Sequence, residues 1–255
     1  MGSNIQLFIT VGLYSLPGMV IGFTLHELMH GVVADRLGDP LPRSQGRLTL
    51  DPLTQIDPVG FAMLYGLGFG FARPVQINTM RIRSDAQRAA VAAAGPLTNL
   101  AVAAVLGIVL RLWTAAQPGV VYPNGSRLSL FFDGFPYLGH GGIAFIVFWI
   151  LYLGMFVNAL LFIFNLIPIP PLDGFQVFKF LFRRAIPEVI DWMERNAQIL
   201  SLAALFLFIV LPTVQQSSTG NFIFDAVQHV TDVLYGGTLP PVQSFVSLLQ
   251  ALRSS

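Results

Sequence analysis

The sequence predicts an all-α polytopic membrane protein with about four to five transmembrane helices and a short β or re-entrant cytoplasmic segment between the first two. Two observations predict this class. The 255-residue chain is 54% hydrophobic and only 11% charged, whereas charged residues make up about a quarter of an ordinary soluble domain. Several apolar stretches are also long enough to span a bilayer. The net charge of +1 gives no indication of nucleic-acid binding.

Four apolar stretches are candidate spans, because a helix needs about 20 residues to cross a bilayer. They run over about Ile5–Ala34, about Ala89–Trp113, about Ile143–Phe164 and the shorter Ile199–Leu211. Residues 221–252 alternate apolar and polar patches, which is typical of either an interfacial helix or a fifth span. We therefore expect a membrane-embedded domain over residues 1–212 and a C-terminal helix of one of these two kinds over 213–255.

Basic residues orient the spans. The loop between the first and second spans carries Arg36, Arg43, Arg47, Arg73, Arg81, Arg83 and Arg88, and the loop after the third carries Lys179, Arg183, Arg184 and Arg195. The other side receives Arg111, Arg127 and, in the tail, Arg253. By the positive-inside rule, both basic loops face the cytoplasm and the N-terminus lies outside.

The first cytoplasmic loop, residues 36–88, is the irregular part of the chain. Gly46–Leu50 and Pro74–Asn78 are bounded by Pro, Gly and Asp and are predicted to be short strands. Between them, Val59–Phe71 is apolar and rich in glycine, and we expect it to re-enter the membrane edge. Residues 40–80 of this loop are therefore a candidate gate or substrate-docking edge.

A metal-binding pattern lies inside the first apolar stretch. Residues His26–His30 read His-Glu-Leu-Met-His, and residues four apart share one face of a helix. Both imidazoles can therefore reach one metal ion while Glu27 points to its edge. Ionisable groups inside a span are costly and mark a functional site. The sequence has no cysteine, so the remaining ligand candidates are histidine and acidic residues.

Asp173 is the best candidate for a third ligand. A catalytic zinc site usually has three protein ligands and one position for water or substrate. Asp173 follows the third span, in a run whose prolines at 168, 170 and 171 forbid a regular helix. The first and third spans both end on the cytoplasmic side, so Asp173 reaches the depth of His26 and His30. We expect one zinc ion per chain at these three residues.

Two further polar residues are candidates for the chemistry. Glu27 is the expected general base, which takes a proton from water and passes it to the leaving amine. Asn165 is a candidate donor to the oxyanion, because it lies shortly before Asp173. Asn99, inside the second span, fits either a bracing or an active-site role, and we favour the bracing role.

On these residues the chain resembles the site-2 proteases, the intramembrane zinc metalloproteases. The matching patterns are His26-Glu27-x-x-His30-Gly31, Gly95-Pro96-x-x-Asn99 and Asn165-x-x-Pro168-x-Pro170-Pro171-Leu172-Asp173-Gly174. The stretches 36–39, 46–50, 57–58 and 72–75 also resemble those of the compact bacterial and archaeal members, which have no PDZ or CBS domain. The resemblance covers about residues 5–185.

The resemblance implies zinc at His26, His30 and Asp173, Glu27 as base and Asn165 assisting at the active site. It further implies an integral protein of a prokaryotic inner or cell membrane, with the active site toward the cytoplasm. The expected reaction is regulated intramembrane proteolysis, the cleavage of a transmembrane helix of a membrane-protein substrate. The substrate helix must unwind first, and pairing with an exposed strand edge would stabilise its extended form.

Two other functions are compatible with intramembrane histidine and acidic residues. A metal or proton transporter uses such groups, but it more often scatters acids over several spans and shows repeat symmetry. A catalytically silent protein that binds transmembrane segments has no need of Glu27. We expect His140 and His229 to be ordinary loop or interfacial histidines. The expected partners are a transmembrane protein substrate and the lipid bilayer, with no nucleic acid.

Overall fold

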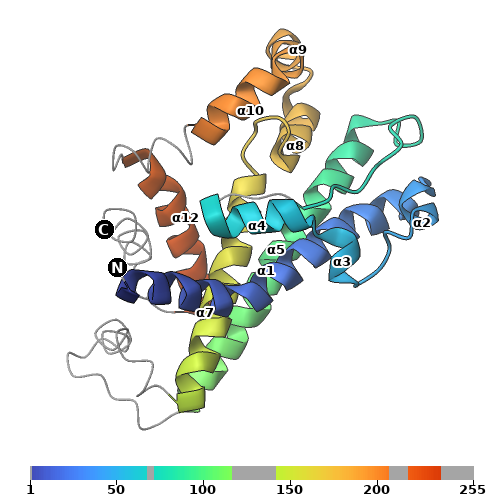
Figure 1. Cartoon of the computed structure of the whole chain (residues 1–255). Helices are drawn as coiled ribbons and strands as arrows, with labels where there is room; N and C mark the ends of the chain where they lie inside the picture. The colour runs from blue at the N-terminus through green and yellow to red at the C-terminus, as the bar shows by residue number, and fades with distance from the viewer. Residues whose placement is uncertain (1, 68–71, 117–141, 207–217, 237–255) are drawn as a thin grey trace. The chain divides into compact units, whose positions relative to one another are not determined.

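The computed structural model describes the chain except residues 1, 68–71, 117–141, 207–217 and 237–255. The described helices are α1 (Gly2–Arg36), α2 (Leu41–Ser44), α3 (Pro52–Gln55), α4 (Pro58–Leu67), α5 (Asp85–Ala115), α7 (Gly142–Asn165), α8 (Asp173–Phe182), α9 (Pro187–Arg195), α10 (Ala197–Leu205) and α12 (Ser218–Tyr235) (Figure 1). Within these ranges the fold is all helical apart from one isolated antiparallel bridge between Ile56 and Ala72.

Three helices are long and apolar enough to cross a membrane, and they confirm the first three predicted spans. Their candidate membrane segments are Val11–Arg36 in α1, Asp85–Trp113 in α5 and Ile146–Asn165 in α7. Of the fourth predicted span, α10 covers the part up to Leu205, and residues 207–211 lie outside the described ranges. In the C-terminal region, residues 218–235 form helix α12. Whether this region is an interfacial helix or a fifth span stays a prediction, and so does the domain boundary at 212–213.

The chain divides into two compact units. One comprises Met1–Met19, Ala101–Leu160 and Asn221–Ser255, and the other comprises Val20–Leu100 and Leu161–Gly220. The three long helices contribute residues to both. The first unit holds most of the aromatic and aliphatic packing of α7, and the second holds every candidate ligand.

In the first unit, α1 and α7 approach each other through glycine. A Cβ atom added to Gly18 would overlap the backbone at Gly154, so no side chain fits between the two helices. The buried Asn158 amide donates hydrogen bonds to the carbonyl oxygens of Gly18 at 3.1 Å and Gly154 at 2.8 Å. Small residues and a bridging amide are the usual means of joining membrane helices, because in lipid no hydrophobic effect drives the helices together.

In the second unit, the loop 36–88 contains the short helices α2, α3 and α4, and the two segments predicted as strands are irregular. Gly46–Leu50 and Pro74–Asn78 are not strands, so this part of the prediction is wrong. The helices α3 and α4 that lie between these segments have capped starts: the Asp51 carboxylate accepts from the Leu53 amide at 3.0 Å, and Asp57 accepts from the Val59 amide at 2.9 Å. Proline follows each aspartate at the first helical position, where its missing N–H costs nothing.

The segment 73–78 is held by side chains instead of a neighbouring strand. The Val75 amide donates to the Glu27 carboxylate at 3.0 Å, and the Asn78 amide donates to Asp39 at 2.7 Å. These two N–H groups are therefore not available for a ladder. The apolar stretch before this segment is α4 as far as Leu67. Figure 1 shows the short helices α2 and α3 beside the C-terminal end of α1.

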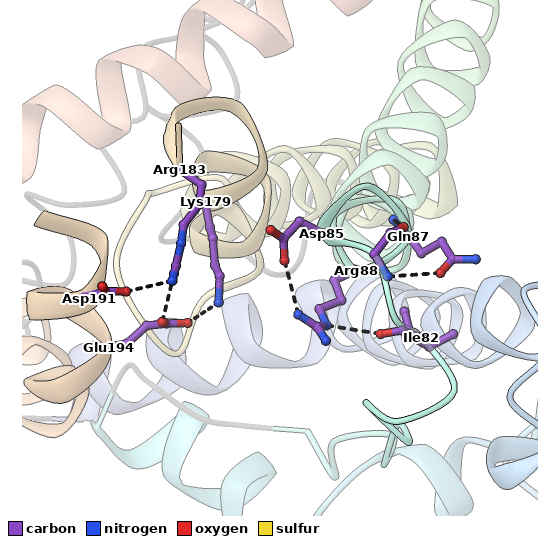
Figure 2. A network of polar contacts seen from close by, with 9 residues as sticks. Ile82, Asp85, Gln87, Arg88, Lys179, Arg183, Asp191 and Glu194 are labelled. Atoms are coloured by element: carbon purple, nitrogen blue, oxygen red, sulfur yellow. Dashed lines mark hydrogen bonds and ion pairs between the residues drawn. The ribbon is translucent and has the colours of Figure 1, made fainter. Parts of the chain in front are cut away.

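Polar networks fix the ends of α5 and α8 in the same unit (Figure 2). At the start of α5, Ser84 and Gln87 form a reciprocal capping box, with hydrogen bonds of 3.1 and 3.2 Å. Between α8 and α9, Lys179 pairs with Glu194, and Arg183 lies 2.9 Å from Asp191 and 3.3 Å from Glu194. Helix α9 is thereby tied to the helix that begins with Asp173.

The ion pairs also set the charge of Glu194. Partial burial raises the pKa of the Glu194 carboxyl, but Lys179 and Arg183 lower it by more, so the pKa is below its ordinary value. Glu194 is therefore ionised at neutral pH, as its pairing with two cations requires.

The glycine approach in the first unit predicts an asymmetric response to alanine. Gly18→Ala places its methyl group on the Gly154 backbone, which cannot yield, and should destabilise the chain by about 1–3 kcal/mol. Gly154→Ala is the matched control, because its nearest neighbour is the Leu106 side chain at 3.1 Å, which can rotate. Thermal unfolding of the full chain in detergent micelles should rank Gly18→Ala well below Gly154→Ala. Equal melting temperatures would contradict the close approach.

Candidate active site

The three predicted ligands lie together. His26 and His30 are one turn apart on α1, and Asp173 is the first residue of α8. The two Nε2 atoms are 3.0 Å apart, and Asp173 Oδ2 lies 3.2 Å from the His26 Nε2 and 3.3 Å from the His30 Nε2. Among the described residues, these side chains form a group that fits a single metal ion. The structure thus brings together residues that are more than 140 positions apart in the sequence.

Hydrogen bonds orient both imidazole rings. The His26 Nδ1 lies 2.6 Å from the Asn99 Oδ1, while the Asn99 amide nitrogen donates to the Gly22 carbonyl at 3.2 Å. This second bond fixes which end of the amide faces the ring, so His26 Nδ1 is the donor. His30 Nδ1 donates to the Val91 carbonyl at 2.7 Å. With both Nδ1 atoms protonated, the lone pairs lie on the Nε2 atoms that face Asp173.

One face of α5 forms the wall behind the histidines. Val91, Gly95 and Asn99 recur every four residues and therefore line a single helix face. A Cβ atom added to Gly95 would lie 2.7 Å from the His26 Nε2 and closer still to the His30 Nε2. Glycine is needed here for the close approach of the α5 backbone to the rings, and a larger residue would occupy the space that the donor atoms share.

The donor set fits a zinc ion. Metal–ligand bonds of about 2.0–2.2 Å in a tetrahedral site place neighbouring donor atoms about 3.3–3.6 Å apart. The three separations here, 3.0, 3.2 and 3.3 Å, are close to this spacing. Two imidazoles and one carboxylate, with no sulfur, are also a ligand set of catalytic zinc sites, in which the fourth position stays open.

The protonation state of Asp173 suits a ligand. Burial raises the pKa of the Asp173 carboxyl, but when the imidazoles also carry a proton on Nε2, their hydrogen bonds and charge outweigh burial and lower the pKa to about 2. The carboxylate is therefore ionised at neutral pH, and ligation requires this form.

The proline-interrupted run delivers Asp173 to the histidines. Helix α7 ends at Asn165, and α8 begins at Asp173. A Cβ atom added to Gly174 would overlap the Leu166 carbonyl and lie 2.8 Å from the Ile167 oxygen, so α8 starts directly against the backbone that follows α7. The predicted irregular run is confirmed, and Gly174 serves a close approach.

Glu27 is buried and firmly held. It follows His26 on α1 with 8% of its surface exposed, and its Oε2 accepts the Val75 amide at 3.0 Å. The carboxylate next to the proposed ligands is thus fixed by the segment 73–78. This contact had no signal in the sequence, because a backbone N–H group can come from any residue.

The other predicted residues lie as follows. The Asn165 amide donates to the Leu161 carbonyl one turn earlier at 2.9 Å, so its active-site role stays a prediction. Asn99 has both roles that were considered, since it braces α1 at Gly22 and also orients His26. Its spacing of four from Gly95 was the signal for a shared face. His229 lies exposed on α12, and His140 is outside the described residues.

Comparison with known proteins points to one family. Residues 14–212 match the model of peptidase family M50. Three relatives are each named "Putative zinc metalloprotease": YwhC of Bacillus subtilis, Rip2 of Mycolicibacterium smegmatis and MJ0611 of Methanocaldococcus jannaschii. No solved structure matches the chain.

The three matches are of similar extent. YwhC is 33% identical over 167 residues, covering 65% of this chain and 68% of the relative. Rip2 is 30% identical over 182 residues, covering 68% and 57%. MJ0611 is 30% identical over 172 residues, covering 67% and 72%. The match thus spans little more than half the length of Rip2, and about two thirds or more of the other two.

The glycine wall predicts a specific loss of metal. Gly95→Ala should abolish zinc binding, because the added methyl group occupies the space that the two Nε2 atoms share. Leu97→Ala is a matched control, since Leu97 lies on the same helix and is 55% exposed. Zinc per chain, measured by elemental analysis of purified protein, should fall toward zero in the first variant and stay native in the second. A full zinc complement in Gly95→Ala would contradict the site.

Proposed function

The chain belongs to peptidase family M50 and is a membrane zinc metalloprotease, and on this premise we propose that it hydrolyses a peptide bond within or beside a transmembrane helix of a membrane-protein substrate. One observation carries the proposal. His26, Glu27 and His30 all lie inside the candidate span Val11–Arg36, so the scissile bond must come to the depth of a membrane helix. Peptidase membership favours this function over a transporter.

His26, His30 and Asp173 would hold the zinc ion through two nitrogen atoms and one oxygen atom. When bound at such a site, zinc supplies Lewis acidity and activates water for attack on a carbonyl. Asn99 and the Val91 carbonyl keep the imidazoles in the required tautomer, and buried ligands held in this way lose little freedom on metal binding.

Glu27 would move the proton. The Val75 amide holds Oε2, so Oε1 is the oxygen that takes a proton from the attacking water and passes it to the leaving nitrogen. Asn165 would donate a side-chain N–H to the developing oxyanion, and the other N–H of the same amide bonds to the Leu161 carbonyl. The basic loop 36–88 supports a site that opens toward the cytoplasm.

The substrate must present an extended backbone, because a helix hides its peptide bonds in internal hydrogen bonds. The segment 73–78 is a suitable partner. Its Val75 and Asn78 amides are bound to Glu27 and Asp39, whereas the Gln76 backbone N–H has no partner within the described ranges and the residue is exposed. We expect the substrate to pair with the backbone at Gln76, beside the base.

Substitution at the site separates zinc binding from catalysis. Glu27→Gln should keep one zinc per chain but slow cleavage of a model transmembrane substrate by about 100- to 10,000-fold, because the base is lost. Asp173→Ala should lose zinc and activity together. Cleavage at the native rate by Glu27→Gln would contradict the mechanism.

A single proline substitution tests whether the substrate pairs with the backbone at Gln76. Gln76→Pro removes the unpaired N–H and should weaken cleavage by raising KM, with zinc retained. Gln76→Ala is the control, because it loses only the side-chain bond between Gln76 and Gln45 and keeps the backbone donor. Equal KM values for the two variants, measured on the same transmembrane substrate, would exclude pairing at this residue.

A further inference from the structure

Arg47 is a second buried ionisable group in the unit that contains the site. It lies between α2 and α3, outside the candidate spans, and only 6% of its surface is exposed. By contrast Arg43, one turn before it, has a side chain that is 69% exposed and pairs with Asp35 at 2.6 Å. Burial of a guanidinium is costly unless its donors are satisfied, so its contacts indicate what it holds.

The Arg47 guanidinium bridges two stretches of backbone. Its Nη1 donates to the Thr54 carbonyl at 2.5 Å, and its Nη2 donates to the Arg73 carbonyl. The Arg73 amide in turn donates to the Gln55 carbonyl at 2.9 Å, beside the Ile56–Ala72 bridge. Arg47 therefore fixes the chain at Arg73, two residues before the amide that binds Glu27.

The neighbouring Gln55 side chain supports the same arrangement. Gln55 is fully buried, and its amide nitrogen donates to the Arg47 carbonyl at 2.7 Å and to the Thr49 carbonyl at 3.0 Å. The backbone that carries Arg47 is thus held from one side while its guanidinium holds Arg73 on the other. At the far end of the segment, Asp39 holds the Asn78 amide. Val75 lies between two fixed points.

The charge of Arg47 also acts on Glu27. Burial lowers the pKa of the Arg47 guanidinium, while the Glu27 carboxylate raises it and Arg73 lowers it. The guanidinium nevertheless remains protonated at neutral pH, because arginine does not lose its proton in proteins. A fixed cation near Glu27 complements the carboxylate.

We propose that Arg47 is a positioning residue for the hydrolysis: by fixing the Arg73 backbone, its guanidinium keeps the Val75 amide on Glu27 Oε2 and so holds the base in place. This inference rests on the proposed function. The planar guanidinium is essential to it, since it donates to two carbonyls at once, which the single ammonium of lysine cannot do with the same geometry.

The test compares Arg47→Lys with Arg43→Ala in the full chain reconstituted in lipid vesicles. Arg47→Lys keeps the charge but not the bridge. It should retain one zinc per chain, while kcat falls by about 100-fold through misplacement of the base and KM rises because Gln76, the proposed substrate partner, lies in the loosened segment. Hydrogen exchange of the peptide covering residues 73–78 should become faster. Arg43→Ala should resemble the native chain in all four measurements.

The possible results separate the explanations. A native kcat in Arg47→Lys would overturn the proposal, and would assign Arg47 a role through charge alone if Arg47→Ala were inactive. A lower kcat with unchanged exchange over 73–78 would also overturn it, because the effect would not pass through this segment. If Arg47→Ala fails to fold, Arg47→Lys still decides.

Hydrogen exchange does not depend on activity, so failure of the proposed function can be recognised separately. In one outcome, the native chain cleaves no transmembrane substrate, but Arg47→Lys lowers the exchange protection of the 73–78 amides. This would contradict the proposed protease function and support the role of Arg47 in fixing the segment. In the other outcome, the native chain cleaves the substrate, and Arg47→Lys changes neither the exchange nor kcat. This would support the protease function and overturn the proposal for Arg47.

Discussion

The cost of placing ionisable side chains in an apolar span governs this structure. His26, Glu27 and His30 lie in a helix that is otherwise apolar enough to cross a membrane, and unpaired polar groups at such a depth are expensive. Each therefore has a defined partner: Asn99 for His26, the Val91 carbonyl for His30 and the Val75 amide for Glu27. The remaining donor atoms face Asp173. The hydrogen bonds that satisfy these buried groups therefore also orient them for a metal site.

This requirement explains why distant parts of the chain are shaped as they are. Helix α5 presents Val91, Gly95 and Asn99 on one face, and the glycine lets its backbone reach the imidazoles. The proline-interrupted run ends α7 in time for α8 to begin with Asp173, and Gly174 seats that start against the preceding backbone. The loop 36–88 supplies the partner for Glu27, and the buried Arg47 fixes that loop. The site thus depends on three elements besides the helix that carries its pattern.

The sequence was sufficient for the features that depend on side-chain type and spacing. Apolar length predicted the first three spans, helical spacing predicted the histidine pair, and the prolines pointed to Asp173. It was insufficient where backbone groups decide the outcome. Pro74–Asn78 has the composition of a strand, yet two of its N–H groups donate to Glu27 and Asp39. No residue type in the sequence indicates these contacts. Arg47 was expected to set topology with the other loop arginines, because burial of one arginine among several has no pattern in a single sequence.

Mapping the bond that the chain cuts tests the position of the active site most directly. Zinc-loaded full chain would be incubated in lipid vesicles with a protein carrying one transmembrane helix, and the products would be identified by mass spectrometry. An active site inside the span of α1 should cut within the transmembrane segment or at its edge, and the cut should be absent after zinc removal and restored by adding zinc. Cuts confined to the water-exposed flanks, or cuts that persist without zinc, would contradict an active site built inside the span of α1.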